Sequence, residues 1–286
     1  MQSKEATLCI RGRLLELTRP KVMGILNLSE DSFYQSSISN TIDSAIGKVS
    51  IMIKEGMDIL DLGPMSSRPG AKLVPTDHEA GLIQKFLVPI KNAFPELITS
   101  LDVFRLESIQ IGIDLGVDII NDITGSHQCQ DVFKSIHDAG LAYILMHSRG
   151  AFGNFHHADQ KHYKHTSTDV IRELAIALDK AMQTGLQSII IDPGFGFSKT
   201  IDQNFELLGQ LECFCILERP LLVGLSRKSM IYTTCKSDQN QVLGGTLAAQ
   251  TIALIKGANI LRTHDVKEAV QCIDIVEKMK SVQSGI

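Results

Sequence analysis

Short apolar runs alternate with amphipathic segments along most of the chain. The runs are rich in Ile, Leu and Val and end at a polar residue or a glycine, which is typical of strands buried on both faces of a parallel sheet. We expect strands at 21–27, 59–63, 97–103, 119–120, 142–147, 189–192, 221–226 and 260–264. The intervening segments space their apolar residues as helices do. They predict helices at 41–55, 78–94, 106–115, 130–139, 168–184, 204–211, 241–256 and 266–279.

This alternation predicts an α/β protein with a closed (β/α)8 TIM barrel. Parallel strands joined by right-handed helical crossovers give such folds, and eight units favour closure over an open sheet. An alternating segment from Thr7 to Leu17, centred on 11–13, predicts a short β-hairpin before the barrel. The length of 286 residues suits one core of this kind, and no linker or low-complexity segment interrupts it. We therefore expect one domain over residues 1–286.

One stretch, 189–200, combines a strand with a chemical signal. Three isoleucines lead directly to Asp192, and a turn with Gly194 and Gly196 follows. A purely structural interpretation explains the isoleucines but leaves the carboxylate unexplained. In a β/α barrel the loops after the strands converge on the functional site, so Asp192 is a candidate site residue.

Polar residues end most of the other strands as well. The strand ends contribute Asn27, Asp61, Asp102, Asn121, His147, Asp192, Lys228, Arg262 and His264. The carboxylates and amide at 102, 121 and 192 suit a planar heterocycle with an amino group and ring N–H donors. Lys228 offers a donor to a carbonyl on the same ring, and the Arg262 guanidinium offers a stacking surface.

A second group of residues suits an anion, and it comprises Asn27, Arg68, Arg262 and His264. Taken singly, Arg68 fits a solvated loop and His264 fits a barrel histidine with ordinary partners. Their coincidence with the first group supports a phosphate site. Asn27 is a neutral oxygen ligand, which binds Mg²⁺ only together with substrate phosphates.

Composition excludes several classes of protein. A net charge of −4 gives no general attraction for nucleic acid or an anionic membrane. No apolar run approaches the length of a membrane span, and the N-terminus does not resemble a secretory signal. Six scattered cysteines indicate reduced thiols, so we expect a cytoplasmic protein. The loop histidines at 156, 157, 162 and 165 lack a supporting ligand pattern, and a solvated loop is favoured over a metal site.

Ordered motifs cover nearly the whole chain. They are Met23-Gly-Ile-Leu-Asn-Leu-Ser-Glu-Asp-Ser-Phe33, Asp61-Leu-Gly-Pro-Met-Ser-Ser-Arg-Pro-Gly70, Asn121-Asp122, Leu145-Met146-His147, Asp192-Pro-Gly-Phe-Gly-Phe197, Ser226-Arg-Lys-Ser229 and Arg262-Thr-His-Asp-Val266. Together with Asp102 they resemble the dihydropteroate synthase family. The resemblance implies a homodimeric β/α barrel that joins dihydropterin pyrophosphate to p-aminobenzoate, releases pyrophosphate, uses Mg²⁺ and is a target of sulfonamides.

The resemblance also implies roles for individual residues. It implies that the pterin is bound by Asp102, Asn121, Asp192, Lys228 and Arg262, with Arg262 stacking on the ring. It implies that the diphosphate is bound by Asn27, Arg68, Arg262 and His264, with Mg²⁺ at Asn27. It places Ser67, Phe197, Lys228 and Ser229 around p-aminobenzoate. The expected substrate-binding set is Asn27, Ser67, Arg68, Asp102, Asn121, Met146, Asp192, Phe197, Lys228, Ser229, Arg262 and His264. Within it we expect Asp102, Asp192, Lys228 and Arg262 to be catalytic.

The chain departs from the family pattern in its first two loops. Ser29-Glu30 replaces a usual Thr-Pro, Pro64-Met65 replaces a usual Gly-Glu, and Ser67 replaces a common Thr but keeps the hydroxyl. Two alternatives therefore remain open. One is another pterin- or folate-binding barrel, such as the methyltetrahydrofolate domain of corrinoid methyltransferases, although the anion motifs argue against it. The other is a non-catalytic homologue that binds a partner.

Overall fold

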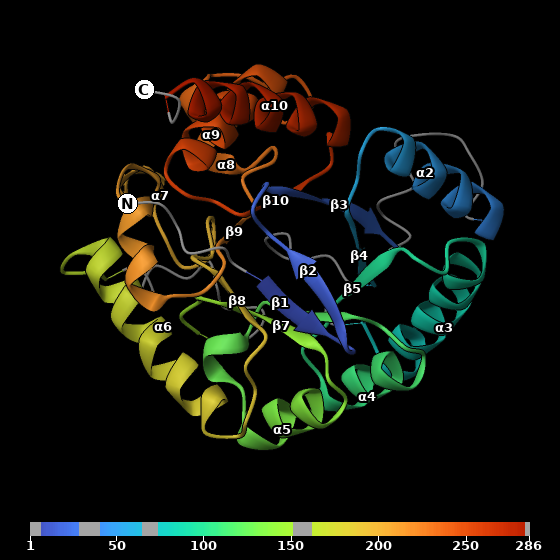
Figure 1. Cartoon of the computed structure of the whole chain (residues 1–286). Helices are drawn as coiled ribbons and strands as arrows, with labels where there is room; N and C mark the ends of the chain where they lie inside the picture. The colour runs from blue at the N-terminus through green and yellow to red at the C-terminus, as the bar shows by residue number, and fades with distance from the viewer. Residues whose placement is uncertain (1–6, 29–40, 65–73, 151–161, 284–286) are drawn as a thin grey trace.

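Eight parallel strands form the centre of the molecule, and helices surround them (Figure 1). The computed structural model describes residues 7–28, 41–64, 74–150 and 162–283. The sheet order is β8-β7-β6-β5-β4-β3-β10-β9. The strands are β3 (Lys21–Asn27), β4 (Ile59–Gly63), β5 (Ile98–Asp102), β6 (Ile119–Asp122), β7 (Ala142–Met146), β8 (Ile189–Asp192), β9 (Leu222–Val223) and β10 (Ile260–Thr263). The expected TIM barrel is thus confirmed.

The two ends of this sheet meet next to β9. A parallel bridge joins Ile191 of β8 to Leu221, and the Ile191 N–H donates to the carbonyl of Pro220 at 2.8 Å. The seventh strand is shorter than the expected 221–226, because the chain leaves the sheet after Val223. Arg227 then adopts a left-handed backbone conformation with φ of 55°, which turns the chain into a helix.

The helices follow the strands as expected. They are α2 (Ile42–Lys54), α3 (Thr76–Ala93), α4 (Leu106–Asp114), α5 (Gln130–Asp138), α6 (Thr166–Met182), α7 (Ile201–Gly209), α8 (Ser229–Thr234), α9 (Leu243–Ile255) and α10 (Val266–Gln283), with 3₁₀ segments η1 (Gly125–His127) and η3 (Leu211–Leu217). Both 3₁₀ segments and α8 were missed in the sequence. Helix α7 starts at Ile201 instead of 204, because Thr200 and Gln203 form a reciprocal capping box.

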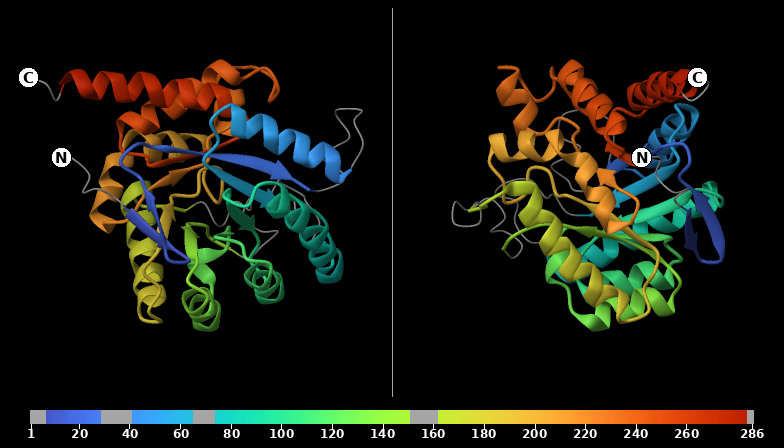
Figure 2. Two further views of the ribbon diagram at one scale, coloured as in Figure 1. Left: turned by 45° about the vertical axis from the view of Figure 1, so that its right-hand side comes forward. Right: turned by 60° about the vertical axis from the view of Figure 1, so that its left-hand side comes forward.

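The N-terminal hairpin covers one end of the barrel. Strands β1 (Thr7–Ile10) and β2 (Arg13–Glu16) pair antiparallel, and both turn residues, Arg11 and Gly12, have positive φ. The buried side chains of the hairpin pack on inward-facing barrel residues, including Met23 and Ile59. Figure 1 shows the hairpin across the centre of the ring of helices, and Figure 2 shows it at one side of the molecule. The hairpin closes the end opposite the strand-terminal loops.

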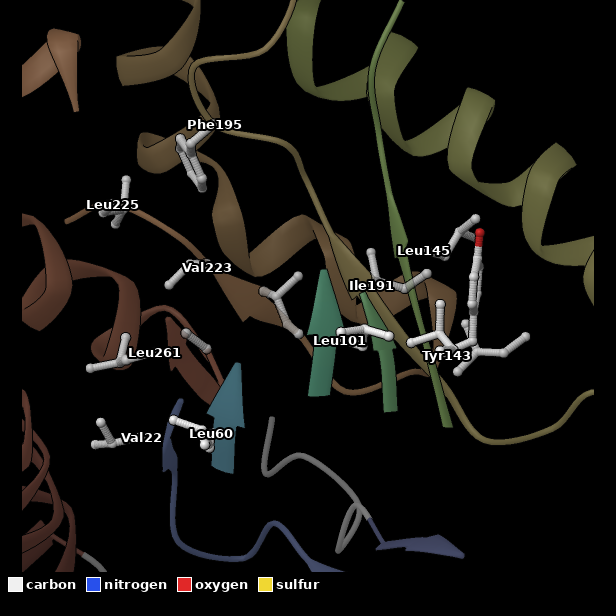
Figure 3. Packing of buried hydrophobic residues seen from close by; sticks show 14 of the residues in the cluster. Val22, Leu60, Leu101, Tyr143, Leu145, Ile191, Phe195, Val223, Leu225 and Leu261 are labelled. Carbon is white, nitrogen blue, oxygen red and sulfur yellow. The ribbon is translucent and has the colours of Figure 1, made fainter. Parts of the chain in front are cut away.

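Side chains alternate along each strand between the helices and the barrel interior. In β4, Leu60 and Leu62 belong to the core under the helices, whereas Ile59 packs toward the hairpin. Asp61 therefore faces the interior, as the two-residue period of a strand requires. Figure 3 shows outward-facing members of this core, from several strands and the loops after them: Val22, Leu60, Leu101, Tyr143, Leu145, Ile191, Phe195, Val223, Leu225 and Leu261.

Candidate active site

A guanidinium between two carboxylates occupies the centre of the barrel. Arg262 of β10 donates from Nε to Asp61 Oδ2 at 2.6 Å and from an Nη atom to Asp102 Oδ2 at 2.8 Å. Asn121 of β6 donates to the same Asp61 oxygen at 3.1 Å. Four strands thus bring these side chains into one buried network, although 201 residues separate Arg262 from Asp61 in sequence.

Burial sets the charge balance of this network. It raises the pKa of Asp102 to about 7, with Arg262 opposing the rise and the nearby Asp61 adding to it. Burial also disfavours the charged form of Arg262, but the two carboxylates outweigh it and hold the pKa above its usual value. The second oxygen of Asp61, Oδ1, is buried without a hydrogen-bond partner among the described residues. A buried carboxylate oxygen of this kind favours a site that accepts a donor from a ligand.

Asp192 stands at the end of β8, where the sequence placed it. Its Oδ1 accepts a hydrogen bond from the Gly194 N–H at 2.7 Å, and the residue is 6 % exposed. Burial raises the pKa of this carboxyl, while the charge of Lys228 and the Gly194 N–H oppose the rise. The turn after β8 thus fixes the orientation of the carboxylate.

Lys228 faces the same turn. Its ammonium group donates to the carbonyl of Phe195 and lies 5.1 Å from the centroid of the Phe197 ring. Burial lowers the pKa of Lys228 to about 8, against the opposing charge of Asp192. The structure therefore joins Asp192, Lys228 and Phe197 around one turn.

A small apolar group lies beside these polar residues. Met146 and Phe197 pack with Ile123, and the partly buried Phe104 lies against them. Met146 follows the outward-facing Leu145 and so faces the interior at the end of β7. An aromatic substrate suits such a group.

The remaining expected site residues lie at the same end of the barrel. Asn27 ends β3 opposite Gly63, His264 is exposed just beyond β10, and Ser229 is the exposed first residue of α8. The His264 N–H donates to Ser226 Oγ at 3.4 Å. Ser67 and Arg68 lie outside the described residues, as do Glu30 and Met65.

The described residues do not assemble a metal cluster from the usual ionisable ligands. No group of three or more His, Cys, Asp or Glu side chains that could hold a metal occurs in ranges 7–28, 41–64, 74–150 and 162–283. His156 and His157 lie outside these ranges. A single amide oxygen at Asn27 fits Mg²⁺ only when phosphate oxygens complete the coordination sphere.

His147 differs from the expectation that it belongs to the polar ring. Its ring is fully buried and bonds to Lys199 and Glu173 instead of the central carboxylates. For Asp61 the difference is the reverse. In the sequence it was noted at a strand end without a role, whereas the structure places it at the centre of the polar network. The signal for Asp61 was its inward position in a strand of apolar residues. Glu173, within α6, gave no such signal.

The barrel and its buried carboxylates define a pterin-binding enzyme. The family model described as "Pterin binding enzyme" matches residues 23–264. Dihydropteroate synthase of Escherichia coli (strain K12) is 34 % identical over 277 residues, covering 96 % of this chain and 97 % of that protein. The enzyme of Clostridium beijerinckii is also 34 % identical, covering 90 % of this chain and 94 % of that protein.

Solved structures agree with this assignment. A Yersinia pestis dihydropteroate synthase in complex with a sulfonamide drug superposes with a TM-score of 0.89 at 33 % identity, covering 96 % of this chain and 99 % of that one. The Xanthomonas albilineans enzyme with 4-aminobenzoic acid gives 0.85 at 32 % identity, covering 97 % and 99 %. The chain belongs to the dihydropteroate synthase family.

Proposed function

We propose that the protein condenses 6-hydroxymethyl-7,8-dihydropterin pyrophosphate with p-aminobenzoate to give 7,8-dihydropteroate and pyrophosphate. It is a transferase of folate biosynthesis, and a pterin-binding barrel domain spans residues 1–286. The observation that carries the proposal is the network of Asp61, Asp102, Asn121 and Arg262 inside the barrel mouth. Buried carboxylates and an amide at one place match the donors of a pterin ring.

Asp102, Asn121 and Asp192 bind the edge of the pterin, and Lys228 donates to its carbonyl. Arg262 stacks on the ring face and keeps its ion pair with Asp61. The Asp192 carboxylate is already oriented by Gly194, so little reorganisation is needed when the pterin binds. The negative charges of Asp102 and Asp192 stabilise the positive charge that develops on the pterin methylene group as the reaction proceeds.

Asn27, Arg262 and His264, which share a position at the strand ends, bind the diphosphate together with Arg68 of the second sequence motif. Asn27 would hold Mg²⁺ together with the substrate phosphates, and the ion would supply neutralisation of negative charge on the leaving group. Arg262 has a double role, because its guanidinium joins the carboxylates of the pterin site to the anion site. As the C–O bond breaks, the basic side chains stabilise the departing pyrophosphate.

Ser67, Phe197, Lys228 and Ser229 border p-aminobenzoate, with Met146 contributing to the apolar side. The Phe197, Met146 and Ile123 group supports this placement. The aromatic amine is already a competent nucleophile, so its position and the exclusion of water matter more than a strong base. A carbocation-like path with attack on the pterin methylene follows from these roles. A sulfonamide would compete with p-aminobenzoate for this site.

The protein acts as a homodimer in the cytoplasm, as the family resemblance implied. Support for the location comes from the six cysteines, which are all free thiols. No helix in the described part of the chain is long and apolar enough to cross a membrane. The partners are the two small substrates, without nucleic acid or membrane.

The test is turnover of dihydropterin pyrophosphate with Mg²⁺, in the presence and absence of p-aminobenzoate. We expect pyrophosphate release coupled to dihydropteroate formation, with competitive inhibition by sulfanilamide against p-aminobenzoate. A protein that binds pterin but forms no dihydropteroate would contradict the proposal and support a binding homologue. The reversions Glu30→Pro and Met65→Glu would then show whether the altered loops are responsible.

A further inference from the structure

A lysine that the proposed reaction does not use is buried beneath the turn after β8. Lys199 is only 4 % exposed. Its Nζ lies 3.0 Å from the carbonyl oxygen of Gly194, 3.1 Å from that of Phe197 and 3.1 Å from Nδ1 of His147. Three acceptors surround one ammonium group, which has three N–H donors.

The partner of His147 on its other side fixes the proton arrangement. Nε2 of His147 lies 3.0 Å from Oε2 of Glu173. A carboxylate accepts hydrogen bonds, so Nε2 carries a proton and the neutral ring presents a lone pair at Nδ1. All three hydrogen bonds of Nζ then form when Lys199 is a charged ammonium group and His147 is neutral. The Nζ proton directed at Nδ1 is the one that the two residues share.

The same turn carries the residues that face the substrates. Phe197 belongs to the apolar group with Met146, and the Gly194 N–H orients Asp192. The turn also contains Ser198 in a left-handed conformation, φ 52°, whose hydroxyl bonds to the N–H of Arg149 at 3.0 Å. Strain of this kind persists only when the surroundings hold the backbone. Lys199 supplies two of the bonds that do so.

We propose that Lys199 is a positioning residue for the p-aminobenzoate site, and that the proton it shares with His147 keeps the 194–197 turn in the geometry that binds the arylamine. The inference deepens the proposed function and rests on it. Lys199 donates to backbone carbonyls beneath the turn and acts on the substrate only through Phe197 and its neighbours.

The charged groups around the pair determine when that proton is lost. Burial lowers the pKa of Lys199 to about 7, with Asp192 opposing and Lys228 and Arg149 adding to the decrease. Burial lowers the pKa of His147 to about 4; Lys199 and Arg149 lower it further, and Glu173 opposes them. The imidazole is therefore neutral at neutral pH, and the shared proton is lost as the pH rises through about 7.

Two further groups complete this environment. Burial raises the pKa of Glu173, but hydrogen bonds from His147 and Arg149 outweigh it and hold the pKa at about 2. Burial raises the pKa of Tyr163, whose ring lies 3.7 Å from the Arg149 guanidinium. Neither group changes protonation between pH 6 and 9, whereas Lys228, whose pKa is about 8, does, so Lys199→Met removes only part of the pH dependence in that range. After deprotonation, Nζ has two protons for three acceptors, so one of its three hydrogen bonds is lost.

The first experiment compares Lys199→Met with wild type and with Lys134→Met, an exposed control paired with Asp138 on the same helix. At pH 6.5 we expect Lys199→Met to raise the KM for p-aminobenzoate about tenfold, with kcat and pterin affinity changed less than about threefold, because no reacting atom loses a contact. Lys134→Met should match wild type. The wild-type KM should rise between pH 7 and 9, and this rise should be smaller in Lys199→Met.

A second measurement needs no change at Lys199. In ¹⁵N-histidine-labelled wild-type protein, His147 should show a protonated Nε2 and an unprotonated, hydrogen-bonded Nδ1 at pH 6.5, and Nδ1 should shift as the pH rises through about 7 to 8. His147→Asn assigns the signal by its loss. A protonated Nδ1 at pH 6.5 or a signal constant to pH 9 would overturn the shared proton.

The outcomes separate the two proposals. An inactive wild type that forms no dihydropteroate rejects the function itself. If the wild type is active, two results for Lys199→Met would reject the positioning role and leave the function intact. One is an unchanged KM for p-aminobenzoate, and the other is an equal loss of affinity for pterin and for p-aminobenzoate.

Discussion

Arg262 and Asp61 form an ion pair inside the barrel, with Nε of the arginine 2.6 Å from Oδ2 of the aspartate. The Asp61 side chain is completely buried, and Arg262 also contacts Asp102 at 2.8 Å. A pair removed from water in this way is stable only when its geometry and further hydrogen bonds compensate for lost hydration. The pair therefore fixes the guanidinium where the proposed pterin and diphosphate sites meet.

The first prediction removes one charge of this pair. Asp61→Asn keeps the shape but leaves Arg262 without its Nε partner carboxylate, so kcat/KM should fall about 10²-fold, or about 2.7 kcal/mol. Steady-state kinetics measures the loss. The control is Asp274→Asn, which breaks the exposed pair with Arg19 and should cost less than about 1 kcal/mol without a kinetic effect. Equal kinetics in the two variants would disprove a role for Asp61.

The second prediction concerns Asp192. Asp192→Asn should weaken pterin binding by at least about 10²-fold, because an amide cannot replace a carboxylate that accepts two charge-assisted bonds. The fold should persist, since Oδ1 of asparagine can still accept from Gly194. Calorimetric titration with the dihydropterin measures the change, and Asp202→Asn in α7 is the control. Pterin affinity near that of wild type would refute the site assignment.

The third prediction is a pH dependence from Asp102. Its pKa is about 7, so the carboxylate that accepts pterin donors forms as the pH rises through that value. Pterin affinity should therefore increase between pH 6 and 8, and this increase should be absent in Asp102→Asn. Between pH 3.8, the ordinary pKa of an aspartic acid, and about pH 7, the folded state binds more protons at this group than the unfolded state. Its contribution to stability should consequently fall as the pH rises across that window.

The fourth prediction tests the turn after β8. Gly194 has φ of +70°, and a Cβ at this residue would lie 1.9 Å from the carbonyl oxygen of His147. Gly194→Ala should thus destabilise the protein by about 3 kcal/mol or more, since backbone must move. Gly209→Ala, at the exposed end of α7 with nothing within 4 Å, should be neutral or stabilise by up to about 1 kcal/mol. Urea denaturation compares the two.

The fifth prediction separates stability from catalysis. Leu15 is 7 % exposed beneath the barrel, whereas its neighbour Leu14 is 71 % exposed. Leu15→Ala should cost about 2–5 kcal/mol, and Leu14→Ala should stay within about 0.5 kcal/mol. Neither should change KM, because the hairpin lies at the end opposite the site. A KM change in either variant would show that the hairpin influences the site.

Residues near one another in sequence determined much of the fold and of the candidate site. Apolar runs and helical spacing predicted the eight-unit barrel and its hairpin, because burial and period depend on local pattern. The same pattern placed Asp102, Asn121, Asp192 and Arg262 at strand ends. The pattern did not predict α8, because the chain turns into this helix through a left-handed conformation at Arg227, which cannot be predicted from the residue type.

Only the tertiary structure decided which of these residues meet. Asp61 became the centre of the site because barrel closure brings β10 beside β3 and turns Arg262 toward it. His147 does not belong to the polar residues at the barrel mouth, because its two ring nitrogens bond to Lys199 and Glu173. These partners come from a later turn and from a helix. Sequence determines local periodicity and chemical type, whereas hydrogen-bond partners depend on distances between segments that only the folded chain sets.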